Sequence, residues 1–112
     1  MEIIDARTEM TEEQKNYDAV LAFTDDFFGQ GRVSADGRGF VGSRSSVYIN
    51  MDRNSMASDI EIMLSPSKLG IHIIVNKEEC YEEAKRFGES YENRFEGGNV
   101  RLTHNRPYQT GR

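Results

Sequence analysis

Two short segments in the second half of the chain alternate apolar and polar residues, and this alternation most constrains the fold. The apolar members are Ile60, Ile62 and Leu64 in the first segment and Ile71, Ile73 and Val75 in the second. A period of two residues is typical of a strand with one buried face. Between the segments, Ser-Pro-Ser-Lys-Leu-Gly supplies turn-forming residues. We therefore predict an antiparallel hairpin.

Further strands are indicated before and after this hairpin. The segment 46–51 alternates Val47, Ile49 and Met51 with polar residues, and Val100 and Leu102 begin a similar pattern near the C-terminus. Residues 29–46 are rich in Gly, Ser and Arg. Within them, only the adjacent pair at 40–41 is bulky and apolar, which indicates a loop with one short strand.

Apolar stripes at helical spacing predict two helices. Thr11 with Gln14 forms a capping-box pattern that starts the first helix, which we expect to end near Phe28. Asn76 with Glu79 has the same pattern and starts the second. The first stripe contains Tyr17, Val20, Leu21, Thr24, Phe27 and Phe28, and the second contains Cys80, Ala84, Phe87, Tyr91 and Phe95.

These elements predict an α+β fold. We expect an antiparallel sheet of three to five strands, with the two amphipathic helices packed on one face, in the order α-β-β-β-α-β. A chain of 112 residues with 37% hydrophobic content can form one modest core. The predicted domain spans residues 1–104, and 105–112 form a polar tail.

The sequence favours a cytoplasmic protein. Its acidic first ten residues do not resemble a secretory signal, and its densest apolar stretch, Ile71–Val75, is too short to span a bilayer. The lone Cys80 cannot form an internal disulfide, which is consistent with a reducing compartment.

The motifs with possible catalytic or cofactor roles have simpler interpretations, so we expect no enzyme activity, metal or cofactor. Residues 37–42 match the spacing of a nucleotide-binding glycine loop, but no helix follows them. His72 and Cys80 are conceivable as base and nucleophile, although acidic neighbours and the apolar stripe indicate a buried structural thiol. His72 and His104 lack the spacing of paired zinc ligands.

Charge is distributed unevenly along the chain. Residues 1–36 contain nine acidic and three basic residues, and residues 77–96 contain seven and four. Residues 37–76 contain three acidic and four basic residues, and 97–112 contain three arginines and no acid. The net charge of −5 therefore arises from the two helical segments, while the loop, sheet and tail are neutral to basic.

Our leading functional hypothesis is a non-enzymatic protein-binding module. Its acidic helical face would bind a basic, nucleic-acid-binding surface of a partner enzyme and so act as a nucleic-acid mimic and inhibitor. In size and charge the chain resembles phage-encoded inhibitors of host defence such as anti-CRISPR proteins, which is an analogy of class alone. The predicted partner-binding residues are Asp25, Asp26, Glu78, Glu82, Glu89 and Glu96.

The alternative hypothesis is a nucleic-acid-binding module that uses the basic half of the chain. Its predicted binding residues are Arg38, Arg44, Arg53, Arg101 and Arg106. A half-open sheet would also allow a homodimer through edge pairing or face packing. No membrane partner is expected.

The element order over residues 11–95 superficially resembles a double-stranded-RNA-binding domain. That family contacts phosphates with a lysine cluster at the start of its second helix, whereas this chain has Asn-Lys-Glu-Glu-Cys at 76–80. The resemblance therefore concerns the order of elements, and the RNA-binding activity is not carried over.

Overall fold

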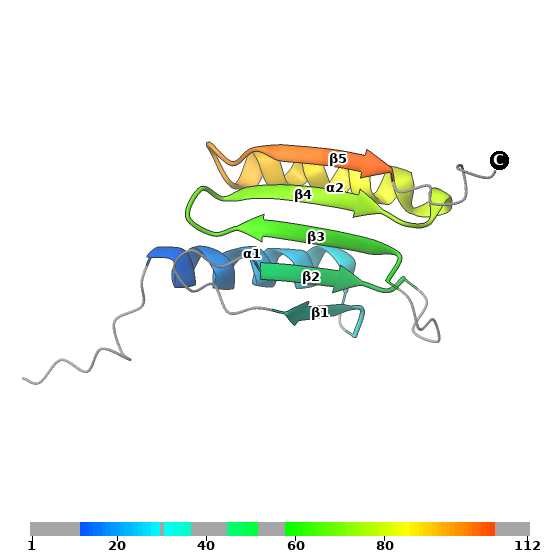
Figure 1. Ribbon diagram of the computed structural model, residues 1–112, viewed down its shortest axis with the longest axis horizontal. Helices are drawn as coiled ribbons and strands as arrows, with labels where there is room; N and C mark the ends of the chain where they lie inside the picture. Colours follow the sequence, from blue (N-terminus) through cyan, green and yellow to red (C-terminus); the bar gives the residue numbers. More distant parts are fainter. Residues whose placement is uncertain (1–11, 30, 37–44, 52–57, 105–112) are drawn as a thin grey trace, which may run out of the picture.

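The structure, a computed structural model, describes residues 12–29, 31–36, 45–51 and 58–104. The order of elements is α-β-β-β-β-α-β, with a short 3₁₀ helix before the second α-helix (Figure 1). The elements are α1 (Glu12–Phe28), β1 (Val33–Asp36), β2 (Ser45–Ile49), β3 (Ile60–Ser65), β4 (Gly70–Val75), η2 (Glu78–Cys80), α2 (Tyr81–Arg94) and β5 (Val100–His104).

The five strands form one mixed sheet in the order β1-β2-β3-β4-β5. The first three pairings are antiparallel, and the β3–β4 pairing confirms the predicted hairpin. The predicted antiparallel sheet is thus confirmed for β1 to β4, but β5 pairs with β4 in parallel, so the sheet is mixed. The reason is the connection: α2 carries the chain back along the sheet, and a crossover of this kind returns the next strand in the same direction.

The structure has a strand near the end of α1 that the sequence did not predict. The structure has β1 at Val33–Asp36, paired with β2 from Val33↔Ile49 to Asp36↔Ser46. The predicted short strand at residues 40–41 lies outside the described residues, as do the glycine loop 37–42, the Thr11 cap and the tail 105–112.

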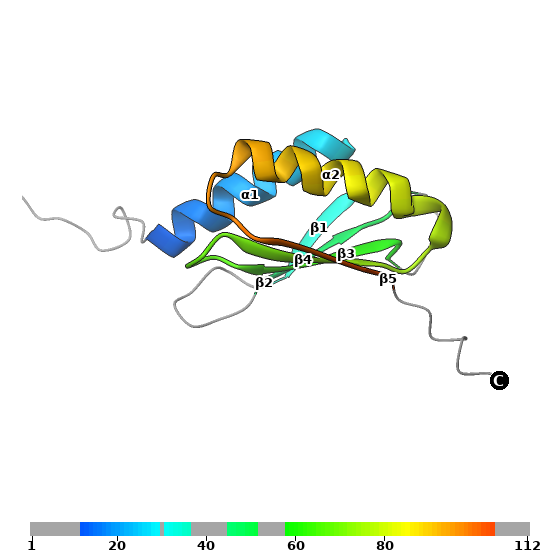
Figure 2. The ribbon, with the colours of Figure 1, turned by 90° about the horizontal axis from the view of Figure 1, so that it is seen from above.

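Both helices cover the same face of the sheet (Figure 2). In β2, β3 and β4 alternate residues are buried, as the period of two predicted. The sheet contributes Val47, Ile49, Ile60, Ile62, Leu64, Ile71, Ile73 and Val75 to the core. No described helix has the length and apolar character needed to cross a bilayer.

Aromatic side chains join the two helices above the sheet. The ring of Phe23 in α1 lies 5.5 Å from those of Phe87 and Phe95 and 6.1 Å from that of Tyr91, measured between centroids. The Tyr91 hydroxyl donates a 2.8 Å hydrogen bond to Leu69 O. Burial raises the pKa of Tyr91, so this phenol remains a donor at neutral pH.

The start of the second helix differs from the predicted capping box. The Asn76 side chain donates to Ser58 O (3.1 Å) and Glu61 Oε2 (2.8 Å), both at β3 or just before it. The chain instead enters the 3₁₀ helix at Glu78 without a side-chain cap. The Asn76 amide is thus used to join β4 to β3, because those acceptors lie beside it in the sheet.

Buried Asp59 anchors the same corner. Its Oδ2 accepts a 2.9 Å hydrogen bond from Met51 N, and its Oδ1 lies 3.4 Å from Lys77 Nζ. The carboxylate of Asp59 raises the pKa of Lys77. Asp59 therefore ties the end of β2 and the residues before η2 to the start of β3.

The burial of Phe87 among the aromatic rings leads to a prediction about stability. We expect Phe87→Ala to lower the free energy of unfolding by about 3–5 kcal/mol, because Phe87 is fully buried and its removal leaves a cavity. Urea denaturation followed by circular dichroism measures this change. The exposed control Asn93→Ala on the same helix should change stability by less than about 0.5 kcal/mol.

Candidate functional site

Three of the four acidic residues of α2 lie toward the same side of that helix. Its buried residues are Ala84, Phe87, Gly88 and Tyr91. At about 100° per residue, Glu82, Glu89 and Glu92 project from the flank next to Gly88. Arg86 and Arg94 project from the other flank, where Arg86 pairs with Glu83 at 2.9 Å and Arg94 lies over the Phe95 ring. The two signs are only partly separated, because Lys85 lies between Glu89 and Glu92 on the first flank and Glu83 lies on the second.

The flank of α2 that contains Glu82, Glu89 and Glu92 lies beside β5, the last strand of the sheet. One hollow beside it is lined by Glu78, Tyr81, Glu82 and His104. A second is lined by Ile73, Ala84, Lys85, Gly88, Glu89, Glu92, Val100 and Leu102. We call Glu78, Glu82, Glu89 and Glu92 the acidic ledge. Lys85 is the one basic residue that lines either hollow.

The second hollow is an apolar groove between α2 and β5. It has a volume of about 150 Å³, and Val100 and Leu102 are only partly buried beside it. Gly88 permits the close approach of helix and strand, because a Cβ atom there would lie 3.2 Å from Val100 Cγ1 and 3.4 Å from Ile73 Cδ1. Sites for drug-sized molecules usually enclose about 300–1,000 Å³, so this groove suits a single aliphatic side chain.

The backbone of β5 adds hydrogen-bonding groups to this site. Asn99 O accepts a 2.8 Å hydrogen bond from Ile71 N, and β5 then continues in parallel register with β4. In such a ladder, residues that bond to the neighbouring strand alternate with residues whose N–H and C=O point away. The backbone groups of Val100 and Leu102 therefore point to the outer edge, which no other described strand covers.

The structure separates the six predicted acidic residues into two groups. All six are exposed. Glu78, Glu82 and Glu89 belong to the acidic ledge, and Glu96 follows α2 in the turn toward β5. Asp25 and Asp26 lie in the last turn of α1, which contains no basic residue. Among the described residues, the one ion pair within α2 is Arg86–Glu83, so the ledge has no compensating ion pair.

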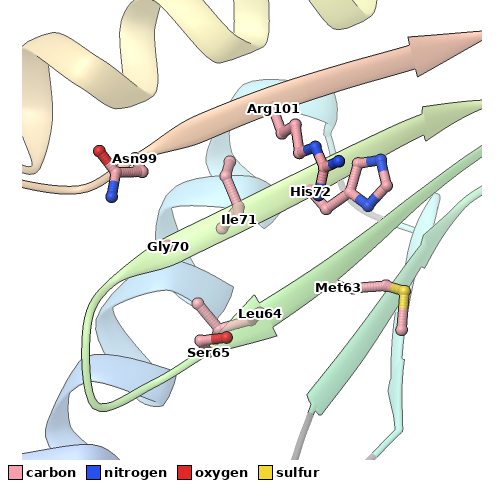
Figure 3. A pocket seen from close by; sticks show the side chains of 8 residues that line it. All are labelled: Met63, Leu64, Ser65, Gly70, Ile71, His72, Asn99 and Arg101. Atoms are coloured by element: carbon pink, nitrogen blue, oxygen red, sulfur yellow. The ribbon is translucent and has the colours of Figure 1, made fainter.

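The predicted basic site is described only at Arg101. Arg38, Arg44, Arg53 and Arg106 lie outside the described residues. Arg101 is exposed on the sheet face opposite the helices, beside His72 in the register. Figure 3 shows both at a hollow of about 350 Å³ that is also lined by Met63, Leu64, Ser65, Gly70, Ile71 and Asn99.

His72 is held as a neutral imidazole in this hollow. Partial burial and the nearby Arg101 charge lower the pKa of His72, and its Nε2 is hydrogen-bonded with Thr103 Oγ1. At neutral pH the hollow therefore has one cationic side chain, Arg101. It lacks the paired charges that usually clamp a phosphate.

His72 and Cys80 do not form a catalytic pair. His72 faces the open side of the sheet, whereas Cys80 is part of the core beneath the helices. Burial, followed by the nearby Asp59 and Glu79 charges, raises the pKa of Cys80. The described residues also contain no group of three side chains suited to hold a metal ion.

Sequence reasoning did not identify Glu92, the apolar groove or the free edge of β5 as parts of the site. The spacing of Lys85, Glu89 and Glu92 at i, i+4 and i+7 next to Gly88 marks one flank of a helix. That signal cannot reveal which strand lies below the flank, because the strand is distant in the sequence.

Comparison of the chain with protein-family models, with curated proteins and with solved structures finds no match.

Burial of Cys80 gives a prediction about reactivity. At pH 7.5 we expect iodoacetamide to label native Cys80 at least about tenfold more slowly than the urea-unfolded chain, because the raised pKa keeps the thiol protonated and the core excludes the reagent. Mass spectrometry over time measures the labelling. Equal rates in the native and unfolded protein would show that this thiol is accessible.

Proposed function

We propose that this protein is a non-enzymatic module that binds a basic surface of a partner protein through the acidic ledge of α2. The class of partner that suits this charge is a nucleic-acid-binding enzyme, whose phosphate-contacting lysines and arginines form a basic surface. Occupation of that surface would make the module an inhibitor that acts as a nucleic-acid mimic.

The observation that carries the proposal is the excess of acidic over basic residues on the flank of α2 beside β5. An ordinary solubilising face intersperses both signs, which gives favourable pairs along the helix. Here Glu82, Glu89 and Glu92 occur on the flank beside β5 with one basic residue, Lys85, and Glu78 precedes them. Glu78 precedes Glu82 by four residues, a spacing at which like charges repel. This arrangement sacrifices local stability and concentrates negative charge beside β5.

The C-terminal end of α1 adds to the same negative potential. Asp25 and Asp26 are exposed where the helix dipole is already negative, and the last turn of α1 contains no basic residue. Because α1 and α2 lie on one face of the sheet, their acidic residues belong to one helical layer (Figure 2). Asp25 and Asp26 would therefore add to the long-range attraction of a basic partner, while the contact itself is made at the acidic ledge.

The ledge is tested by a change of charge sign. We expect the tagged protein to capture a basic partner from the cells that produce it, and Glu82→Lys/Glu89→Lys to reduce recovery by about tenfold or more, because attraction becomes repulsion. Quantitative mass spectrometry measures the recovery. Capture should also weaken as salt is raised, since exposed charges are screened.

The matched control is Glu12→Lys/Asp18→Lys, which makes the same change of net charge at exposed positions of α1. It should retain the partner, and circular dichroism should show that both variants are folded. If the two variants lose the partner equally, the interaction depends on net charge and the ledge is not the binding site.

The nucleic-acid-binding alternative is favoured by one observation, the exposure of Arg101 on the open face of the sheet with half-buried Tyr48 on the same face. We expect no gel shift with generic DNA or RNA at 150 mM salt. A shift that Arg101→Ala weakens, together with recovery of nucleic acid alone in the capture experiment, would establish that alternative in place of the protein-binding module.

A further inference from the structure

We propose that the partner binds as an extended basic segment that adds to the free edge of β5 as a sixth strand. One aliphatic side chain of this segment enters the groove between α2 and β5, and flanking lysines or arginines pair with the acidic ledge. The inference rests on the proposed function for the class of partner and adds how that partner is recognised.

The edge of β5 has the groups that strand addition requires. The N–H and C=O groups of Val100 and Leu102 point away from β4, as derived above from the Asn99–Ile71 hydrogen bond. Figure 1 shows β5 at the outer edge of the sheet with α2 lying along it. Main-chain hydrogen bonds supply affinity in this mode of recognition, and pockets for alternate side chains supply specificity.

The side chains above that edge define the sequence pattern of the ligand. On an added strand, residues two apart lie about 6.6–6.8 Å from one another and face the same side. The groove lies beside Gly88, and the ledge continues along α2 toward Glu82 in one direction and Glu92 in the other. An aliphatic residue in the groove would thus place the residue two positions away near Glu92 in one direction and, past Lys85, near Glu82 in the other. The pattern is basic-x-aliphatic-x-basic.

The charge of the ledge distinguishes this ligand from a second copy of the chain. Pairing two β5 strands edge to edge would bring two acidic ledges together, with Glu82 and Glu89 of each copy beside those of the other. That contact would be repulsive, whereas a basic segment is complementary. The groove volume of about 150 Å³ also matches one side chain of a peptide better than a folded surface.

The test uses the full chain and the synthetic peptide Thr-Lys-Thr-Ile-Thr-Lys-Thr, which presents the same pattern in both strand directions. Amide hydrogen exchange is measured by NMR with increasing peptide, up to saturation or millimolar concentration. We expect exchange of the Val100 and Leu102 amides to slow by about tenfold or more, because their N–H groups become hydrogen-bonded. The Arg101 and Thr103 amides, which face β4, should change much less.

Two altered peptides separate backbone pairing from charge attraction. The peptide is methylated at one or the other set of alternate backbone nitrogens, and methylation of the set that faces β5 should weaken binding by about tenfold or more, because it removes the edge hydrogen bonds. Replacement of both lysines by glutamate should abolish binding. Unchanged affinity of both N-methylated registers, or absence of slowing at Val100 and Leu102 with millimolar peptide, would overturn the inference.

Protein variants locate the contact. Glu82→Gln/Glu89→Gln should lower the affinity for the peptide by about tenfold, whereas the matched control Glu12→Gln/Asp18→Asn should leave this affinity unchanged. Equal effects of the two variants would contradict binding at the ledge. If exchange at Val100 and Leu102 becomes slower as the protein concentration is raised without peptide, the occupant of the edge is a second copy of the chain. That result would overturn the inference.

The inference and the proposed function can fail separately. If the peptide does not bind but Glu82→Lys/Glu89→Lys still abolishes partner capture, the partner uses the acidic ledge without adding a strand. If that variant captures the partner normally, the proposed function is wrong, whatever the peptide does.

Discussion

The contact of α2 with β4 and β5 is the interaction on which the rest of the structure depends. Gly88 lets the helix approach Val100 and Ile73 closely, and Phe87 and Tyr91 on the adjacent face meet Phe23 of α1. The helix is thereby held between α1 on one side and the edge of the sheet on the other. In this position, the charged flank of α2 borders the groove between α2 and β5.

The parallel addition of β5 has a second consequence for the surface. A hairpin would have placed the last strand beside β4 without a covering helix, but the crossover through α2 covers one face of β5 and leaves its outer edge open (Figures 1 and 2). In natural proteins, charged residues or covering segments usually prevent an edge strand from pairing with another chain. Here the helix side of the edge has four acidic residues and Lys85, and this excess of negative charge discourages self-association and favours basic segments.

Much of the fold could be predicted because burial leaves a local signature. The period of two at Ile60–Leu64 and Ile71–Val75 predicted the hairpin, and the stripe from Cys80 to Phe95 predicted the buried side of α2. The capping box at Asn76 failed because its amide found acceptors at Ser58 and Glu61, which are remote in sequence. The candidate site was predicted in part: Glu78, Glu82 and Glu89 were named, but the strand beside them was not.

The sequence by itself determined the two α-helices, the strands β2 to β5, which of their faces are apolar, and that negative charge belongs to the helices. Each of these properties depends on neighbours within a few turns or residues. Only the tertiary structure decided that β5 runs parallel to β4, that the flank of α2 with Glu82 and Glu89 lies beside this strand, and that a groove opens beside Val100 and Leu102. These features arise from packing between segments far apart in the chain, where shape and close approach at Gly88 select one arrangement among several that share the same pattern.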